Sequence, residues 1–206
     1  MQLDTFDPIT VSTRTINAGE SEVKGFEIEV EYAPIAVEGL MVYGSYNYNE
    51  AEYNDFVNTC SQTQLIDGTC PDDPDVGFQN LGGEPLTLAP ENSGTLGINY
   101  EGQFLDGLIY RLGAVAVFSD DYQTNTNNDP LGVQDSYETL ALNAAIATAD
   151  EAWTLEVVGK NVTDEDYFVS SVSQPLTGAE GVVQQDFLVT KARGREVIVQ
   201  LTYRFQ

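Results

Sequence analysis

Apolar and polar residues alternate strictly in the segment GFEIEVEY, residues 25–32. One register is entirely apolar and contains Phe26, Ile28, Val30 and Tyr32. The other register contains three carboxylates, Glu27, Glu29 and Glu31. Successive side chains of a β-strand point to opposite faces, so a period of two is typical of a strand. Three glutamates on one face need water, and we therefore predict a strand with one apolar and one solvated face.

The same two-register pattern occurs in six further segments. They are residues 39–49, 95–100, 110–118, 140–148, 154–162 and 196–206. In the last segment the apolar register becomes aromatic towards its end and comprises Val197, Val199, Leu201, Tyr203 and Phe205. We therefore predict an all-β chain of seven strands, with a partial eighth strand at Gln2–Phe6.

The connections between these strands are alternately short and long. The short connections are residues 33–39, 101–107 and 149–152, and the long ones are residues 50–92, 119–139 and 163–194. In an up-and-down meander, alternate turns emerge at the same end. Outer-membrane barrels have short periplasmic turns and long extracellular loops, with strands of about 9–11 residues and aromatic residues at the strand ends. The pattern therefore predicts an antiparallel up-and-down transmembrane β-barrel.

A barrel in a membrane gives the two registers different environments. The apolar register would face lipid, and its predicted lipid-facing residues are Phe26, Ile28, Val30, Tyr32, Val197, Val199 and Leu201. The glutamates Glu27, Glu29 and Glu31 would face a wet lumen. A closed barrel also leaves no strand edge with unpaired amides in the hydrocarbon.

Composition excludes several classes of function. The net charge is −25 with only eight Lys and Arg residues, which argues against nucleic acid as a partner because phosphate recognition needs clustered basic side chains. The chain has no histidine, the usual general base, so we expect no enzyme activity, no cofactor and no metal site. Eleven Tyr and nine Phe residues favour β-structure over disorder. The start, MQLDTFDPIT, lacks the basic and apolar regions of a secretory signal, so we expect a cytoplasmic start or a piece of a longer protein.

The two cysteines lie in the segment TCSQTQLIDGTC, as Cys60 and Cys70. With no histidine and no further cysteine, a zinc site is disfavoured. A disulfide that closes a loop fits better and implies an oxidising compartment. Two unrelated thiols remain the alternative.

Several segments resemble one family, the TonB-dependent outer-membrane receptors. They are NAGESEVKGFEIEVEYAP (17–34), GLMVYGSYNYNEAEYNDF (39–56), PLTLAPENSGTLGINYE (85–101), VVGKNVTDEDYF (157–168) and GREVIVQLTYRFQ (194–206). They follow the family order and cover nearly all of the chain. The resemblance implies a barrel of 22 strands filled by an N-terminal plug. It also implies capture of a scarce external ligand, most often a ferric siderophore, and import driven by TonB.

The resemblance assigns further roles. Residues 1–206 would be the C-terminal part of the receptor barrel, without the plug domain, in the outer membrane of a Gram-negative bacterium. Tyr203 and Phe205 would belong to the terminal-strand signal read by the insertion machinery. Expected partners are outer-membrane lipid, lipopolysaccharide, the plug domain, TonB and an iron–siderophore or other small ligand. The alternatives are a self-closed small barrel acting as an anchor or adhesin, and a soluble carbohydrate- or calcium-binding β-domain.

Two loop features are candidates for ligand chemistry. Residues 50–91 contain nine carboxylates and no basic residue, but the run DDPDVG at residues 72–77 does not match the spacing of a calcium loop. We interpret it as a solvated external loop. Tyr122, Tyr137 and Tyr167 lie in or near the long connections, where aromatic side chains are candidates for ligand contacts.

Overall fold

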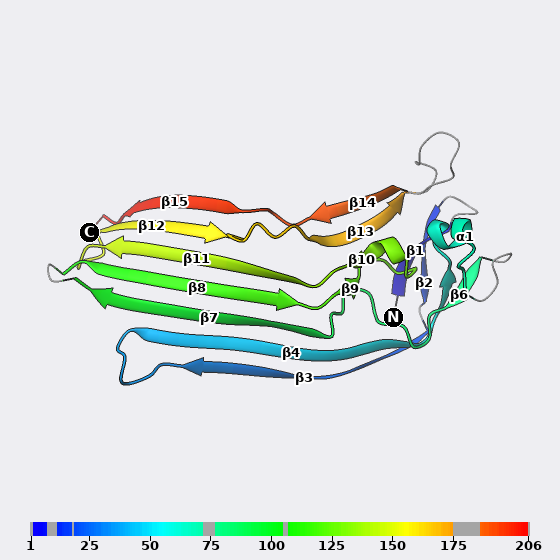
Figure 1. The fold of residues 1–206 in the computed structure, drawn as a ribbon, viewed down its shortest axis with the longest axis horizontal. Coiled ribbons are helices and arrows are strands. Elements are labelled where there is room, and N and C mark those ends of the chain that lie inside the picture. The colour runs from blue at the N-terminus through cyan, green and yellow to red at the C-terminus, as the bar shows by residue number, and fades with distance from the viewer. Residues whose placement is uncertain are drawn as a thin grey trace.

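The computed structural model describes residues 2–7, 12–17, 19–71, 77–104, 107–174 and 186–205. Seven antiparallel strands form one sheet in the order β15-β12-β11-β8-β7-β4-β3, as Figure 1 shows. Their bounds are β3 (Glu20–Tyr32), β4 (Leu40–Asp55), β7 (Asn92–Gln103), β8 (Ile109–Ser119), β11 (Tyr137–Ala147), β12 (Trp153–Lys160) and β15 (Glu196–Tyr203). The predicted all-β meander of seven strands is confirmed.

The strand bounds differ from the predicted ones where the apolar pattern fades. β3 begins at Glu20 and β4 runs to Asp55, beyond the alternating segments, because their backbones continue to pair through polar residues. β12 and β15 end earlier than predicted, at Lys160 and Tyr203. Hydrophobic alternation marks the part of a strand that contacts two different environments, and main-chain pairing extends past it.

The predicted partial strand at the N-terminus forms, but it does not join the wall. β1 (Gln2–Asp7) pairs with β2 (Ser12–Asn17) in a separate two-stranded sheet. Within the described residues, β3 and β15 each have one partner strand and do not pair with each other. The sheet is therefore open, and the self-closed small barrel considered as an alternative is not formed.

The register places the apolar positions of all seven strands on one face. A single row of directly opposite residues runs from Tyr32 through Val42, Ile98, Ala114, Leu142 and Gly159 to Val197. Directly opposite residues share a face of the sheet. The residues predicted to face lipid therefore lie on one continuous surface, with Val197 66% and Leu201 65% exposed.

The opposite face is polar and lined by small residues. One of its rows runs through Met41, Asn99, Gly113, Asn143, Val158 and Ile198. Glu27, Glu29 and Glu31 lie on this face, opposite Asn47, Ser45 and Tyr43. Ile198, the single apolar residue in the polar register of the last strand, thus lies in a row that also carries two asparagines.

Short turns and long connections lie at opposite ends of the sheet, as predicted. The short turns and the C-terminus are at one end, and the long connections and the N-terminus are at the other (Figure 1). We call residues 56–91, 120–136 and 161–195 the first, second and third loops. Gly39 ends one short turn with a φ of +81° and lies against the carbonyl of Glu101, so only glycine fits there.

The long loops contain secondary structure that the sequence did not predict. The elements are β5 (Val57–Thr59), α1 (Gln62–Asp67), β6 (Phe78–Asn80), β9 (Tyr122–Gln123), the 3₁₀ helix η1 (Pro130–Gly132), β10 (Val133–Gln134), β13 (Phe168–Gln174) and β14 (Asp186–Lys191). A buried apolar cluster of Ala51, Tyr53, Phe56, Leu81 and Leu86 joins the end of β4 to the first loop. In the described part of the chain, no helix has the length and apolarity needed to span a membrane.

Candidate functional site

Three tyrosines meet where the second and third loops join the sheet. The rings of Tyr137 and Tyr167 stack with centroids 4.0 Å apart. The hydroxyl of Tyr122 donates to the carbonyl oxygen of Phe168 at 3.4 Å. These three residues were predicted from the sequence as candidate ligand contacts. The structure brings them together from β9, β11 and the segment before β13.

Burial changes the acidity of this tyrosine cluster. Partial burial, together with the neighbouring Tyr137 and Tyr167, raises the pKa of Tyr122 to about 12. Burial and the nearby Tyr137 also raise the pKa of Tyr167. The hydroxyls of Tyr122 and Tyr167 therefore act as neutral donors and acceptors at physiological pH, next to aromatic faces.

A cavity of 430 Å³ lies beside the cluster on the polar face of the sheet. Tyr122 and Tyr137 line it together with Glu27, Leu88 and Pro90 and with residues of β4, β7 and β8. The main-chain N–H of Leu88 donates to the carbonyl oxygen of Gln123 at 2.8 Å. This bond fixes the end of the first loop against the second, so that one cavity combines aromatic, apolar and carboxylate groups.

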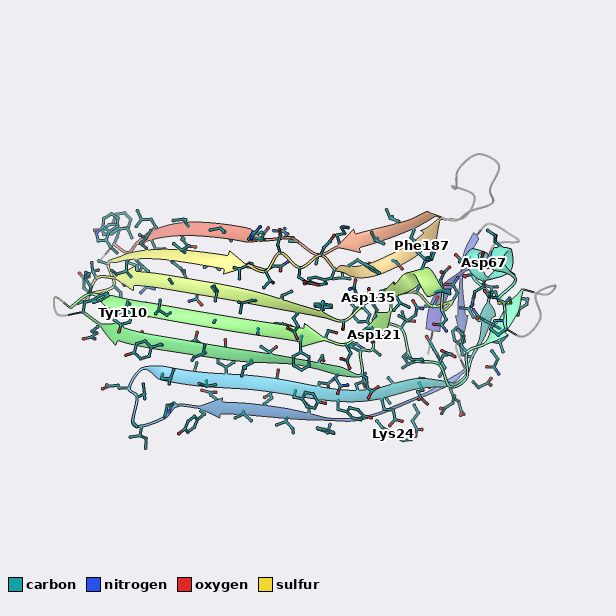
Figure 2. All side chains as sticks on the ribbon, in the orientation of Figure 1. Lys24, Asp67, Tyr110, Asp121, Asp135 and Phe187 are labelled. Carbon is teal, nitrogen blue, oxygen red and sulfur yellow. A yellow bond between two sulfur atoms is a disulfide. The ribbon has the colours of Figure 1, made fainter. Side chains whose placement is uncertain are left out.

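A second cavity of 310 Å³ shares Tyr122 with the first. Its described lining contains six carboxylates and no basic residue; the carboxylates are Glu50, Glu52, Glu84, Glu91, Asp120 and Asp121. Figure 2 labels Asp121 and Asp135 where the sheet meets the second loop. Among the residues that the structure describes, no group of three or more acidic or cysteine side chains is arranged to hold a metal ion. The run DDPDVG, weighed above as a calcium loop, lies outside the described residues apart from Gly77.

Most of the basic side chains form ion pairs with carboxylates that line neither cavity. Six of them form ion pairs: Lys24 with Glu22, Arg111 with Glu101 and Glu151, Lys191 with Asp166, Arg193 with Glu196, Arg195 with Asp164, and Arg204 with Glu151. None of the six lines either cavity. The loop end of the sheet therefore presents excess negative charge towards the polar face.

The predicted lumen-facing glutamates remain without basic partners. Among the described ion pairs, none includes Glu27, Glu29 or Glu31. Glu27 lines the first cavity, and all three lie on edge strand β3. Their environment as lumen wall stays a prediction, because the neighbour of β3 in a closed barrel is not part of this sheet.

The first loop is braced by a disulfide and a capped helix. Cys60 and Cys70 are joined by a disulfide with their α-carbons 5.8 Å apart. Ser61 caps α1: its hydroxyl accepts from the N–H of Gln64, and the Gln64 side chain accepts from the N–H of Ser61. The capping-box spacing S-x-x-Q and the following Gly68, which has a φ of 66°, were signals from which α1 could have been predicted.

The short-turn end carries a second polar cluster. Glu151, in the turn after β11, binds Arg111 of β8 and Arg204 beyond β15. Arg111 and then Arg204 lower the pKa of Glu151. Beside this cluster, the rings of Trp153 and Tyr203 lie 4.4 Å apart and those of Tyr203 and Phe205 lie 4.7 Å apart. The proposed terminal-strand residues Tyr203 and Phe205 thus form an aromatic group with Trp153 at the short-turn end of the sheet, the end at which Figure 2 labels Tyr110.

Comparison with solved structures shows the fold. The siderophore receptor PiuA from Acinetobacter baumannii matches 92% of this chain with a TM-score of 0.62 and 21% identity. The ferric yersiniabactin uptake receptor FyuA from Yersinia pestis matches 94% with a TM-score of 0.62 and 17% identity. The ferric preacinetobactin receptor BauA from Acinetobacter baumannii matches 98% with a TM-score of 0.58 and 15% identity. The chain spans about a quarter of these receptors, covering 22%, 25% and 25% of their lengths.

Comparison of sequences shows the family. Curated proteins give no significant match. The family model described as TonB dependent receptor-like, beta-barrel matches residues 1–162, which include six of the seven strands of the sheet. Members of this family are receptors and transporters. The chain belongs to the TonB-dependent receptor-like β-barrel family.

Proposed function

We propose that this chain forms the C-terminal wall and the last external loops of a TonB-dependent transporter in the outer membrane of a Gram-negative bacterium. One observation carries the proposal: an uninterrupted apolar face crosses all seven strands, opposite a polar face. A sheet of this kind suits a wall between lipid and water. The family match and the long loops at one end support the same function.

The first cavity, lined by Tyr122 and Tyr137 and called the tyrosine cavity from here on, is the proposed point of contact with the transported ligand. Tyr122 and Tyr137 offer ring faces and hydroxyl groups, and Leu88 and Pro90 offer apolar surface. Ferric siderophores are the first ligand class to test, since the structural relatives carry such ligands in their names. The remaining barrel strands, the plug and the contact with TonB would come from the rest of the receptor.

The charge of the loop end bears on ligand choice within that class. The described lining of both cavities contributes carboxylates and no basic side chain. Clefts lined by one sign of charge concentrate ligands of the opposite sign and repel those of the same sign. We therefore expect neutral or cationic iron chelates to be favoured over chelates that carry a net negative charge.

Uptake measurements test this function. Cells that make the intact receptor and cells that lack it would be supplied with radioactive iron bound to a neutral or a triply anionic siderophore. We expect energy-dependent uptake only with the receptor, a preference for the neutral chelate, and a KM raised roughly 2- to 12-fold by Tyr137→Ala. Tyr137→Phe, which keeps the ring, is the matched control. Uptake that is indifferent to the receptor would refute transport of iron chelates.

The size of the native protein is an independent check. An antibody against residues 56–71 should detect, in outer-membrane fractions, a protein about four times as long as this chain, because the chain spans 22–25% of its structural relatives. A band at 22.5 kDa would instead contradict the proposal that the chain is part of a complete receptor.

A further inference from the structure

Gln79 of β6 is among the most deeply buried side chains of the first loop, with 1% of its surface exposed. Its amide nitrogen donates to the carbonyl oxygen of Asn127 in the second loop at 2.7 Å. The same amide group also exchanges hydrogen bonds with Gln64 at 3.1 and 3.2 Å and reaches the carbonyl of Thr59 at 3.3 Å. The shortest of these bonds is the one that leaves the first loop.

Two further side chains of the first loop bind neighbouring carbonyl groups. The amide of Asn58 donates to the carbonyl oxygen of Thr126 at 2.9 Å, and the hydroxyl of Thr87 donates to that of Asn125 at 3.3 Å. Three consecutive carbonyls of the second loop, those of residues 125–127, therefore accept bonds from side chains of the first loop. Gln79 provides the shortest bond of the set.

Hydrogen bonds within the second loop connect residues 125–127 to β9. The amide of Gln123 donates to the side chain of Asn128 and to the carbonyl of Asp129, both at 3.0 Å. The N–H of Gly132 also donates to the carbonyl of Asp129 at 2.8 Å. These bonds join β9 to η1 around the segment that Gln79 holds. Tyr122 is the first residue of β9 and precedes Gln123, so these bonds connect it to that segment, while the bonds to Phe168 and Leu88 hold β9 from other sides.

We propose that Gln79 is a positioning residue that latches the second loop to the first and thereby fixes Tyr122 at the wall of the tyrosine cavity. Removal of its side chain leaves the carbonyl of Asn127 without this donor in a partly buried setting. An unmade buried hydrogen bond costs more than the bond contributes on average, so the loss falls on the second loop. The first and second loops accordingly open as one unit while Gln79 is present.

Hydrogen exchange measured by mass spectrometry on the intact receptor tests the latch without any ligand. In Gln79→Ala, the amides of residues 123–134 should exchange roughly tenfold faster than in the wild type. The amides of β7 and β8 should be unchanged. Ser61→Ala is the control, because Ser61 is also a buried polar residue of the first loop, and its described side-chain hydrogen bond caps α1 rather than reaching Gln79 or the second loop. It should accelerate exchange only near α1.

The near-isosteric variant Gln79→Met separates the bond from the packing. A methionine has about the same length and volume as glutamine but has no N–H to donate to Asn127. In this variant, hydrogen exchange in residues 123–134 should be accelerated as in Gln79→Ala. The same result is expected if Gln79→Ala also loosens α1. Normal protection of the second loop in Gln79→Met, or equal acceleration in Gln79→Ala and Ser61→Ala, would overturn the latch.

The consequence for uptake rests on the function proposed above. With a neutral ferric siderophore as the probe, Gln79→Ala should raise the KM for uptake several-fold and leave the maximal rate and the amount of receptor unchanged. Adding Tyr122→Ala should raise the KM less in the Gln79→Ala receptor than in the wild type. If the wild-type receptor takes up no iron chelate, the proposed function fails while the exchange result stands. If exchange is unaffected, the latch fails whatever the uptake shows.

Discussion

The environment of the apolar face is best tested at the centre of the sheet. Ile98 lies on β7 between Val42 and Ala114, in the row that crosses all seven strands. It is five residues from the end of β7 at Gln103, or ~17 Å along the strand at the usual rise. The adjacent Asn99 lies on the opposite face, between Met41 and Gly113. Ile98→Arg and Asn99→Arg therefore place the same charge on the two faces at the same height.

The two substitutions should differ strongly in cost. An arginine on the lipid face near the bilayer midplane destabilises a barrel by ~2–4 kcal/mol. That cost shifts the ratio of folded to unfolded receptor by about 30- to 700-fold. Asn99→Arg replaces one polar side chain by another on the polar face, next to Gly113 and the Asn143 side chain, and should cost about 0.5 kcal/mol, as surface substitutions do.

Refolding of the intact receptor into lipid vesicles measures this difference. The folded fraction would be followed across a urea series by the slower migration of unfolded barrels on unheated gels. Ile98→Arg should lower the urea midpoint clearly, and Asn99→Arg should leave it near that of the wild type. Equal midpoints for the two variants, or a greater loss in Asn99→Arg, would refute the assignment of lipid and lumen faces.

Three further predictions concern the loops and the rim. Replacing Cys60 and Cys70 by serine removes a cross-link worth ~2–3 kcal/mol for a loop of this length, so limited proteolysis should cut residues 61–69 earlier while the strands stay protected. Because the pKa of Tyr122 is raised to about 12 in the folded protein, folding favours its neutral form. Exchange protection of the second loop should therefore be complete below pH 10 and be lost as the pH rises towards 12. Because Arg111 and Arg204 lower the pKa of Glu151, the terminal strand should loosen as the pH falls below 4.5. Glu151→Gln should loosen the strand at neutral pH. Faster hydrogen exchange of the Arg204 amide would report both effects.

Each of these predictions has an outcome that would contradict it. Free thiols at both cysteines of the folded, unreduced receptor would exclude the disulfide. A phenolate signal from Tyr122 at pH 10, assigned by comparison with Tyr122→Phe, would show that the cluster is not buried. For the rim, the N–H of Arg204 donates to the carbonyl of Ala152 at 2.9 Å. Unchanged exchange of that amide in Glu151→Gln would show that the ion pairs do not hold the strand.

The wall of this protein could be predicted because each strand separates two environments. The alternation in residues 25–32 and 196–203 specifies which side chains share a face, and the short connections specify which strands are neighbours. Strand ends were predicted less well. At Glu20–Lys24 and Glu50–Asp55 the chain has left the apolar zone, and pairing there depends on the backbone rather than on hydrophobic pattern.

The loops could be predicted only in part, because their structure depends on contacts between distant polar residues. Tyr122, Tyr137 and Tyr167 were candidates by their position in the loops, but their convergence requires the second and third loops to fold back on the sheet. Gln79 and Asn58 gave no signal at all. An amide side chain in a polar segment looks solvated until its partner, more than forty residues away along the chain, is placed beside it.

The hairpin of β13 and β14 affects how the last strand finds its place. Closing the long connection between β12 and β15 as a flexible loop would cost roughly 1 kcal/mol more free energy than closing a loop of about ten residues. The N–H of Ala192 bonds to the carbonyl of Tyr167 at 2.9 Å, so a preformed hairpin leaves only short segments to close. Hairpins form within microseconds, after which pairing would advance from Lys160 and Glu196 to Trp153 and Tyr203. The rim aromatic residues would then be the last to dock, which makes the contact between the rings of Trp153 and Tyr203 a marker of completed folding.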